Sequence, residues 1–311
     1  MTMRHTLLPF LCSISLLASA QVSSLTKHSI PSSMDGEAQT IYYHTSTAKK
    51  RMPLLVQLHS WSFPADSLKT LGLDSIAIAN GYNYLFPNFR GVNNHPKACC
   101  SDYVINDIDE AIDWALQHMN VDKKRIYIVG YSGGGYATLA MYMKSRHKIR
   151  AFSAWCPISD LEQWYKESVE RKNKYAAEII QCTSGTAPFD RSKARGRSPF
   201  YWKTPVKKSR KSTVQIYAGI HDGHTGPVPI TQSINFYNKL IADYGAKDAS
   251  LFVAQRDADY MLAQQSFDAP TDLMLGDKLI HLQRKYQRIS LTIFEGGHDM
   301  LSREAFEGLP K

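Results

Sequence analysis

The stretch Tyr127-Ile128-Val129-Gly130-Tyr131-Ser132-Gly133-Gly134-Gly135-Tyr136-Ala137 decides the fold, because it sets a G-x-S-x-G pentapeptide between an apolar strand and an alanine-containing helix. A strand that runs directly into a helix turns sharply at the serine. The residues around that serine must be small if its hydroxyl is to remain exposed, and the four glycines meet this demand. The stretch predicts that Ser132 is a nucleophile at the carboxyl edge of a sheet. The alternative is an inert serine in a glycine-rich turn, and the rest of the chain must decide between them.

Two residues far downstream complete a predicted catalytic triad. A serine hydroxyl is a weak nucleophile, so it needs a histidine to accept its proton and a carboxylate to orient the imidazole. The predicted strand 213–219 leads into Asp222, and the predicted strand 289–294 leads into His298. Both residues therefore belong at the carboxyl edge of the sheet, where ligands of such folds bind. His221, His224 and Asp299 are the neighbouring alternatives.

The tetrahedral intermediate of acyl transfer also needs two hydrogen-bond donors, which form an oxyanion hole. The first expected donor is the backbone N–H of Gly133, directly after the nucleophile. The second should come from the loop His59-Ser60-Trp61-Ser62, which follows an early apolar strand. We assign Trp61 as this donor, with Ser60 as the second choice.

Short apolar runs alternate with amphipathic segments along the chain, which is the pattern of a parallel α/β sheet. We expect strands near 40–44, 53–58, 83–87, 125–130, 150–156, 213–219 and 289–294, and helices near 66–80, 103–119, 136–146, 161–181 and 230–244. Residues 160–210 interrupt the alternation, and an insertion at this point of such a fold is normally a lid over the site.

The chain resembles the α/β-hydrolase superfamily, in particular the branch that contains the catalytic domains of prolyl-oligopeptidase-like serine peptidases and related carbohydrate esterases. The resemblance covers about residues 41–298 and rests on six short motifs: His59-Ser60-Trp61, Asn88-Phe89-Arg90-Gly91, Gly130-Tyr131-Ser132-Gly133-Gly134, Arg197-Ser198-Pro199, His221-Asp222-Gly223 and Gly296-Gly297-His298. It implies the α/β-hydrolase fold, a mostly parallel twisted sheet with helices on both faces and a helical lid.

A narrower resemblance concerns the substrate class. The Ser60-Trp61-Ser62 loop, the Cys99-Cys100 pair and the segment 154–160 are similar to secreted gut-bacterial esterases that act on pectin, among them α/β-hydrolase pectin methylesterases. This resemblance implies a carbohydrate esterase of pectin degradation, which removes methyl groups from galacturonan.

The N-terminus has the pattern of a secretory signal peptide. A basic start is followed by an apolar stretch and by Ala18-Ser19-Ala20, an A-x-A-like cleavage site. We therefore expect residues 1–20 to be removed and the domain 21–311 to be exported to the periplasm or the cell exterior. We expect no integral membrane segment in it, because no later stretch reaches the 18 apolar residues of a span.

Export to an oxidising compartment permits a disulfide among the four cysteines outside the signal sequence, at positions 99, 100, 156 and 182. Sequence alone does not give the connectivity. A bridge from the Cys99/Cys100 loop to Cys182 would tie two loops near the site. The cysteine and histidine spacings lack a metal signature, so we expect neither a metal nor another cofactor.

The formal net charge is +9, and residues 191–211 hold nine Lys or Arg and no acid. A basic surface favours acidic partners. Nucleic acid, an anionic membrane and polyuronic glycans are the candidates, and predicted export argues against nucleic acid. If the basic segment flanks the pocket, an acidic plant glycan of the pectin type is the expected substrate. Arg90 is the candidate for binding a substrate carboxylate, and a buried structural cation is its equal alternative. The basic segment is either a flank of the site or a solvated loop.

Three functions remain open at this point. The main prediction is a serine esterase that demethylates methyl-esterified galacturonan, and the first alternatives are an acetyl-sugar esterase and a prolyl-oligopeptidase-like exopeptidase. Such peptidases usually carry a large β-propeller, and the short segment before the first strand cannot build one, which favours the esterase. A glycan-binding protein without catalysis is the third possibility, against which the complete Ser, Asp and His set argues.

Overall fold

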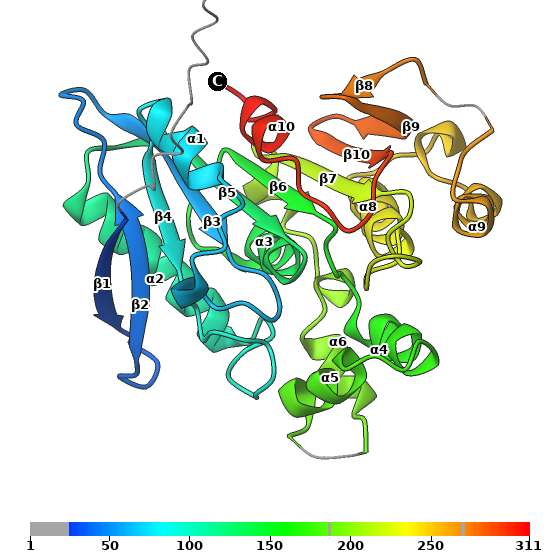
Figure 1. Ribbon diagram of the computed structural model, residues 1–311, viewed down its shortest axis with the longest axis horizontal. Helices are drawn as coiled ribbons and strands as arrows, with labels where there is room; N and C mark the ends of the chain where they lie inside the picture. Colours follow the sequence, from blue (N-terminus) through cyan, green and yellow to red (C-terminus); the bar gives the residue numbers. More distant parts are fainter. Residues whose placement is uncertain (1–24, 186–187, 269–270) are drawn as a thin grey trace, which may run out of the picture.

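The strand that leads to Ser132 lies in the middle of a ten-stranded sheet (Figure 1). The computed structural model describes residues 25–185, 188–268 and 271–311, so the predicted signal peptide, residues 1–20, lies outside the described residues. The strand order is β1-β2-β4-β3-β5-β6-β7-β10-β9-β8. The bounds are β1 (Thr26–Pro31), β2 (Ala38–His44), β3 (Met52–Leu58), β4 (Asn83–Pro87), β5 (Val121–Tyr131), β6 (Ala151–Trp155), β7 (Thr213–Gly219), β8 (Met274–Leu275), β9 (Lys278–Tyr286) and β10 (Ile289–Phe294).

The six central strands, from β4 to β10, run parallel, and antiparallel strands flank them on both sides. Because β3, β5, β6, β7 and β10 all point the same way, the loops that follow them meet at one edge, which we call the carboxyl edge. Ser132, Asp222 and His298 follow β5, β7 and β10. The topology alone therefore brings the three predicted residues to one side of the molecule.

Side chains that alternate along the central strands build a core on each face of the sheet. On β3, Leu54, Val56 and Leu58 pack into one cluster with residues of α2, α3 and α8, whereas Leu55 packs into a second cluster with residues of α1 and α10. A strand buried on both faces is typical of parallel sheets covered by helices. The prediction of an α/β-hydrolase fold is thus confirmed.

Of the helices that cover the two faces, four lie near expected positions, whereas the last two along the chain were not expected. Their bounds are α1 (Leu73–Ala79), α2 (Asp102–His118), α3 (Gly133–Lys144), α8 (Thr231–Asp243), α9 (Gln255–Gln264) and α10 (Ser302–Glu307), with short 3-10 turns η1 (Ala65–Ser67) and η3 (Ala249–Leu251). Among the described residues, no helix combines the length and the apolar character that crossing a bilayer requires.

A group of short helices separates β6 from β7 and lies together outside the sheet (Figure 1). It consists of α4 (Leu161–Glu170), α5 (Tyr175–Thr183), α6 (Arg191–Gly196) and the 3-10 turn η2 (Pro199–Tyr201), and α7 (Val206–Ser209) follows it just before β7. A disulfide joins Cys182 of α5 to Cys99 in the loop before α2, as the sequence suggested. We refer to the described residues between 160 and 201 as the lid, which is shorter than the expected insertion 160–210.

The differences from the predicted elements have local causes. The expected helix 161–181 is two helices, because Lys172 adopts a left-handed conformation with φ of 52° and ends α4. The expected helix 66–80 is shorter and starts after a left-handed Gly72. Strands β1, β8 and β9 and helices α9 and α10 were not expected, since they lie at the margins of the sheet and carry weak apolar alternation.

Candidate active site

The backbone at Ser132 has a conformation that few residues other than glycine adopt. Its φ of 58° and ψ of −118° turn the chain from β5 into α3. Close packing fixes this turn, since a Cβ on Gly134 would lie 2.1 Å from the carbonyl oxygen of Leu58, and one on Gly130 would lie 2.1 Å from that of Gly134. The glycines of the motif therefore allow β3, β5 and α3 to approach closely enough to hold the serine in this conformation.

The structure brings Ser132, His298 and Asp222 together in one hydrogen-bonded series. The distance from His298 Nε2 to Ser132 Oγ is 2.8 Å, and that from His298 Nδ1 to Asp222 Oδ2 is 2.6 Å. The imidazole is thus placed to accept the hydroxyl proton at Nε2 while Nδ1–H donates to the carboxylate. This is the geometry of an activated serine nucleophile.

Asp222 is held rigidly in its loop. Its side chain is fully buried, and its second oxygen, Oδ1, accepts hydrogen bonds from the backbone N–H groups of Gly223 and Val228. Gly226 passes directly over the pair, since a Cβ there would lie 2.3 Å from Asp222 Oδ1 and 2.5 Å from His298 Cβ. The carboxylate is therefore fixed in one orientation toward the imidazole, without contact with solvent.

Two residues that the sequence analysis did not assign hold the loop of His298. The hydroxyl of Tyr131 donates to the carbonyl oxygen of His298, and its ring lies 4.9 Å from the imidazole. The thiol of Cys156 donates to the carbonyl of Asp299 at 3.4 Å. Burial raises the pKa of both groups, so both remain protonated donors. The position of Tyr131 inside the serine motif was a sequence signal that it lies at the site, whereas nothing in the sequence around Cys156 indicated its contact with the His298 loop.

The expected oxyanion donors lie beside each other. A Cβ on Gly133 would be 2.3 Å from the backbone nitrogen of Trp61, and no atom of Ser60 is as close. The N–H of Gly133 is in the first turn of α3, where helical N–H groups lack a partner. Within the described residues the N–H of Trp61 has no acceptor either. Both donors are thus free to bind a developing oxyanion, and the geometry favours Trp61 over Ser60.

The lid contributes an aromatic wall next to this loop. The indole of Trp61 packs against Trp164 at 4.8 Å and lies 6.3 Å from Tyr175, and its Nε1–H donates to Glu178. Glu178 also pairs with Lys174. The wall fixes the oxyanion loop against α4 and α5, and the lid therefore shapes one side of the candidate site.

The structure contradicts the predicted substrate-binding role of Arg90. Its side chain is fully buried, and its five N–H donors make five hydrogen bonds to the carboxylates of Asp35, Glu37 and Asp107. No donor remains for a substrate carboxylate. Arg90 is the structural cation of the alternative interpretation, and it joins the turn after β1 to helix α2.

The basic segment 191–211 does not flank the site as a unit. Arg191 and Arg195 pair with Glu162 of α4, and Arg197 donates to the carbonyl oxygens of Pro96 and Ala98. These cations stabilise the lid, whereas Lys207, Arg210 and Lys211 line a pocket elsewhere. The charge of this segment therefore gives no support to an acidic substrate at Ser132.

Cys156, Asp222 and His298 place potential metal ligands within 4.8 Å of one another. Burial raises the pKa of the Cys156 thiol, so the thiolate that a metal requires is disfavoured. The His298 and Asp222 atoms are also engaged with each other. The chemistry of these donors fits a proton relay and does not fit a metal centre.

Comparisons with known proteins agree with the fold. Residues 74–271 match the prolyl oligopeptidase family. An acylaminoacyl peptidase from Pyrococcus horikoshii is similar in structure, with a TM-score of 0.58, 16% identity and coverage of 92% of this chain and 40% of that chain. A puromycin-hydrolysing peptidase from Mycobacterium tuberculosis has a TM-score of 0.56, 15% identity and coverage of 92% and 37%.

A third similar structure is the S-formylglutathione hydrolase of Staphylococcus aureus, with a TM-score of 0.54, 14% identity and coverage of 92% of this chain and 99% of that chain. The chain thus spans 40% or less of the length of the two peptidases and nearly the whole of this hydrolase. At these identities the similarity establishes the fold, whereas the family match covers well over half of the chain. The chain belongs to the prolyl oligopeptidase family and is a serine hydrolase with the α/β-hydrolase fold.

Proposed function

We propose that the protein hydrolyses an acyl bond in two steps, with Ser132 as nucleophile, His298 as general base and Asp222 as the group that orients the imidazole. The series of hydrogen bonds at 2.8 and 2.6 Å carries this proposal. Ser132 attacks the carbonyl carbon while His298 Nε2 takes the hydroxyl proton, which it then gives to the leaving group. Water attacks the acyl-enzyme in the second step, and His298 again moves the proton.

The N–H groups of Gly133 and Trp61 stabilise the oxyanion of both tetrahedral intermediates. Loss of one such donor typically costs about 3–4 kcal/mol of transition-state stabilisation. The aromatic contacts of Trp61 with α4 and α5 keep its loop in place before substrate arrives. Preorganisation of this kind lowers the barrier because no reorganisation is needed during the reaction.

The first candidate substrate is an aminoacyl or peptide amide. Family membership supports it, and so do the names of the two similar peptidases, one acting on acylaminoacyl substrates and the other on puromycin. The carboxylate next to the oxyanion loop, Glu178, is paired with Lys174 and with the Trp61 indole. It is therefore not free to bind a substrate amino group, which favours amides whose α-amino group is blocked.

The second candidate is the ester of an acidic plant glycan, above all methyl-esterified galacturonan, with an acetylated sugar as its variant. The formal charge of +9 supports an acidic partner for the molecule as a whole. The same Ser132 chemistry cleaves esters and amides, so the choice depends on what the lid admits. This candidate substrate agrees with export of the protein, and we propose that export as well.

A matched panel separates the two candidates. The substrates are N-acetyl-aminoacyl and free aminoacyl nitroanilides, methyl-esterified pectin and acetylated xylan, assayed with the Ser132→Ala variant as the control for each. We expect turnover of the blocked anilide to exceed that of the free amine, and Ser132→Ala to abolish it. Methanol release from pectin without anilide cleavage would replace the first candidate by the second. Turnover that survives Ser132→Ala would refute the whole proposal.

A further inference from the structure

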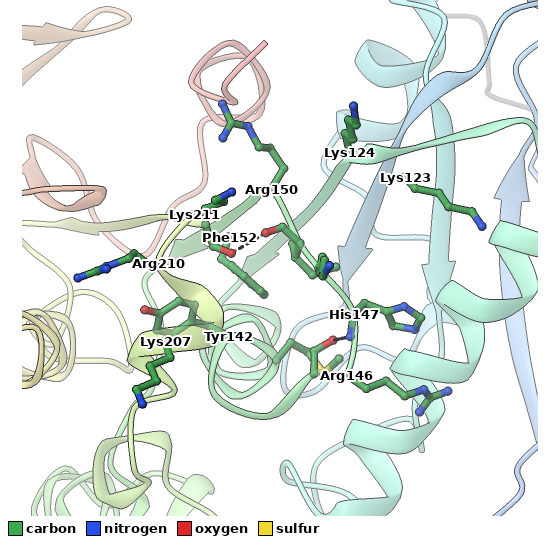
Figure 2. A pocket seen from close by; sticks show the side chains of 15 residues that line it. Lys123, Lys124, Tyr142, Arg146, His147, Arg150, Phe152, Lys207, Arg210 and Lys211 are labelled. Carbon is green, nitrogen blue, oxygen red and sulfur yellow. Dashed lines mark hydrogen bonds between the residues drawn. The ribbon is translucent and has the colours of Figure 1, made fainter.

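A basic pocket lies at the amino ends of the parallel strands, opposite the candidate active site. Figure 2 shows the side chains that line it. It has a volume of about 690 Å³ and is bordered by the start of β5, the end of α3 and the residues just before β6 and β7. Between Lys124 at this end and Ser132 at the other, β5 spans about 25 Å at the usual rise of a strand. We call this hollow the amino-edge pocket.

The charge of the amino-edge pocket has one sign. Eight of its fifteen lining residues are Lys or Arg and none is Asp or Glu: Lys123, Lys124, Arg146, Lys148, Arg150, Lys207, Arg210 and Lys211. Figure 2 shows Lys207, Arg210 and Lys211 on one side of Phe152 and Lys123, Lys124 and Arg146 on the other. A hollow with cations on both sides concentrates positive potential and attracts anions.

Most of these cations are not neutralised by the protein itself. Arg146 pairs with Asp109 and Asp113 of α2. Across the described residues, the side chains of the other seven form no ion pair with a carboxylate. Surface cations elsewhere, in contrast, often pair with a carboxylate, as Lys97 and Lys174 do. A bound anion would relieve the repulsion among the seven. The arrangement is therefore more favourable with an anionic ligand than without one.

The floor of the pocket is apolar and covered. Phe152 and Tyr142 are 3% and 4% exposed, their rings pack edge to face at 5.3 Å, and the Tyr142 hydroxyl lies 2.8 Å from that of Tyr244. Single-stranded nucleic acids require exposed rings on which bases stack. Interfacial binding to membranes uses exposed apolar side chains, and none of the large apolar residues exposed within the described ranges lines this pocket.

The positive surface continues from the pocket onto one face of the sheet, along β7, β10 and β9. A second hollow of about 740 Å³ shares Arg210 with the first and adds Lys285 and Arg288, again without any acid in its lining. Much of that lining is polar and uncharged: Thr213, Gln215, Gln283, Gln287, Ser290 and Thr292. Hydroxyl and amide groups between cations suit a ligand that carries hydroxyls between repeated negative charges. An elongated surface of this composition fits a linear polymer better than a small anion.

We propose that the amino-edge pocket and its continuation bind an acidic polysaccharide, whose repeated carboxylates pair with the unneutralised cations and whose hydroxyls contact the polar residues between them. This binding requires no bond cleavage and is independent of the substrate proposed for Ser132. It would hold the molecule on an acidic glycan while the carboxyl edge, with Ser132, remains open to its own substrate.

The test uses fully de-esterified polygalacturonate, which offers Ser132 no ester or amide bond, and measures equilibrium binding from about 50 to 500 mM salt. We expect binding at low salt that is lost at high salt. The test variant carries Lys148→Gln, Arg150→Gln and Lys211→Gln together. Three exposed charge contacts correspond to about a tenfold weaker affinity at low salt, and turnover of a small substrate should not change.

The control variant carries Lys27→Gln, Lys69→Gln and Lys172→Gln, which lower the net charge equally at sites outside both hollows. We expect its affinity to stay within about twofold of the unaltered protein, since non-specific attraction alone depends on total charge. Thermal unfolding checks that each variant is folded. If the test variant does not fold, we replace it by a second variant that carries Lys123→Gln, Lys124→Gln and Lys207→Gln together.

Three results would overturn the proposal. The first is an equal loss of affinity in the control variant, which would assign binding to net charge. The second is the absence of binding to polygalacturonate at low salt. The third is tighter binding, at equal charge concentration, to single-stranded DNA or to anionic phospholipid vesicles, which would assign the surface to a different class of partner.

Discussion

Replacement of Arg90 by Met should strongly destabilise the protein and leave its reaction unchanged. The guanidinium is fully buried and donates to three carboxylates, of which Asp107 is itself only 1% exposed. A pair of charges about 4 Å apart at an effective dielectric constant near 20 is worth about 4 kcal/mol. Removal of one partner also leaves Asp107 buried without its counter-ion, which typically costs about 3–5 kcal/mol.

We therefore expect the Arg90→Met substitution to lower the free energy of unfolding by about 3–5 kcal/mol and the unfolding temperature by about 10 °C. Urea unfolding and calorimetry measure both quantities. Arg90→Lys should fall in between, because an ammonium keeps the charge but cannot form five directed hydrogen bonds. The double variant Arg90→Met, Asp107→Leu should recover much of the loss, since neither charge stays buried.

The same variant tests the substrate-binding interpretation of Arg90. At temperatures where Arg90→Met is folded, kcat and KM should equal those of the unaltered protein, because no donor of Arg90 faces a substrate. An unfolding temperature within about 2 °C of the original, together with a raised KM for a carboxylate-bearing ester, would refute the structural role and restore the substrate-binding one.

Three further predictions concern the relay, the disulfide and a partly buried acid. Asp222→Asn should lower kcat by about 10⁴ with the fold retained, because His298 loses the carboxylate that orients it; a loss below tenfold in steady-state assays would remove Asp222 from the relay. Reduction of Cys99–Cys182, which closes a loop over a sequence separation of 83, should cost about 4 kcal/mol of unfolding free energy in denaturant titrations, and an unchanged midpoint would contradict this. Burial raises the pKa of Glu167 from 4.5 to about 7, so between these pH values the folded state binds a proton that the unfolded state has lost. The free energy of unfolding should therefore fall by up to about 3 kcal/mol as pH rises from about 4.5 to 7. Glu167→Gln should flatten this pH dependence, and an equal slope in both proteins would exclude Glu167 as its source.

The sequence was sufficient for the centre of the fold because the central strands carry dense apolar runs. All seven predicted strands are present, from β2 to β10, and the G-x-S-x-G turn lies where the alternation predicted it. The convergence of Ser132, Asp222 and His298 also follows from topology, since each residue comes directly after a parallel strand. The sequence shows which strand a residue follows, and in a parallel sheet this is enough to predict at which edge of the sheet the residue lies.

The errors arose where tertiary contacts decide the outcome. Arg90 has the same local sequence whether it faces a substrate or a buried carboxylate, and its partners Asp35 and Asp107 are far from it along the chain. The charges of residues 191–211 form one basic segment in the sequence, but α6 and α7 direct them to two different parts of the molecule. Neither the partners of Arg90 nor the final positions of these charges can be read from the local sequence.

The left-handed backbone of Ser132 implies that the working form of this chain is not its most stable form. A residue held in so sparsely populated a region stores about 1–3 kcal/mol, and glycine would adopt that geometry freely. An inactive descendant that carries Ser132→Gly would thus unfold at a higher temperature than its parent. Natural selection for the chemistry, and not for robustness, must be what retains a side chain at this turn.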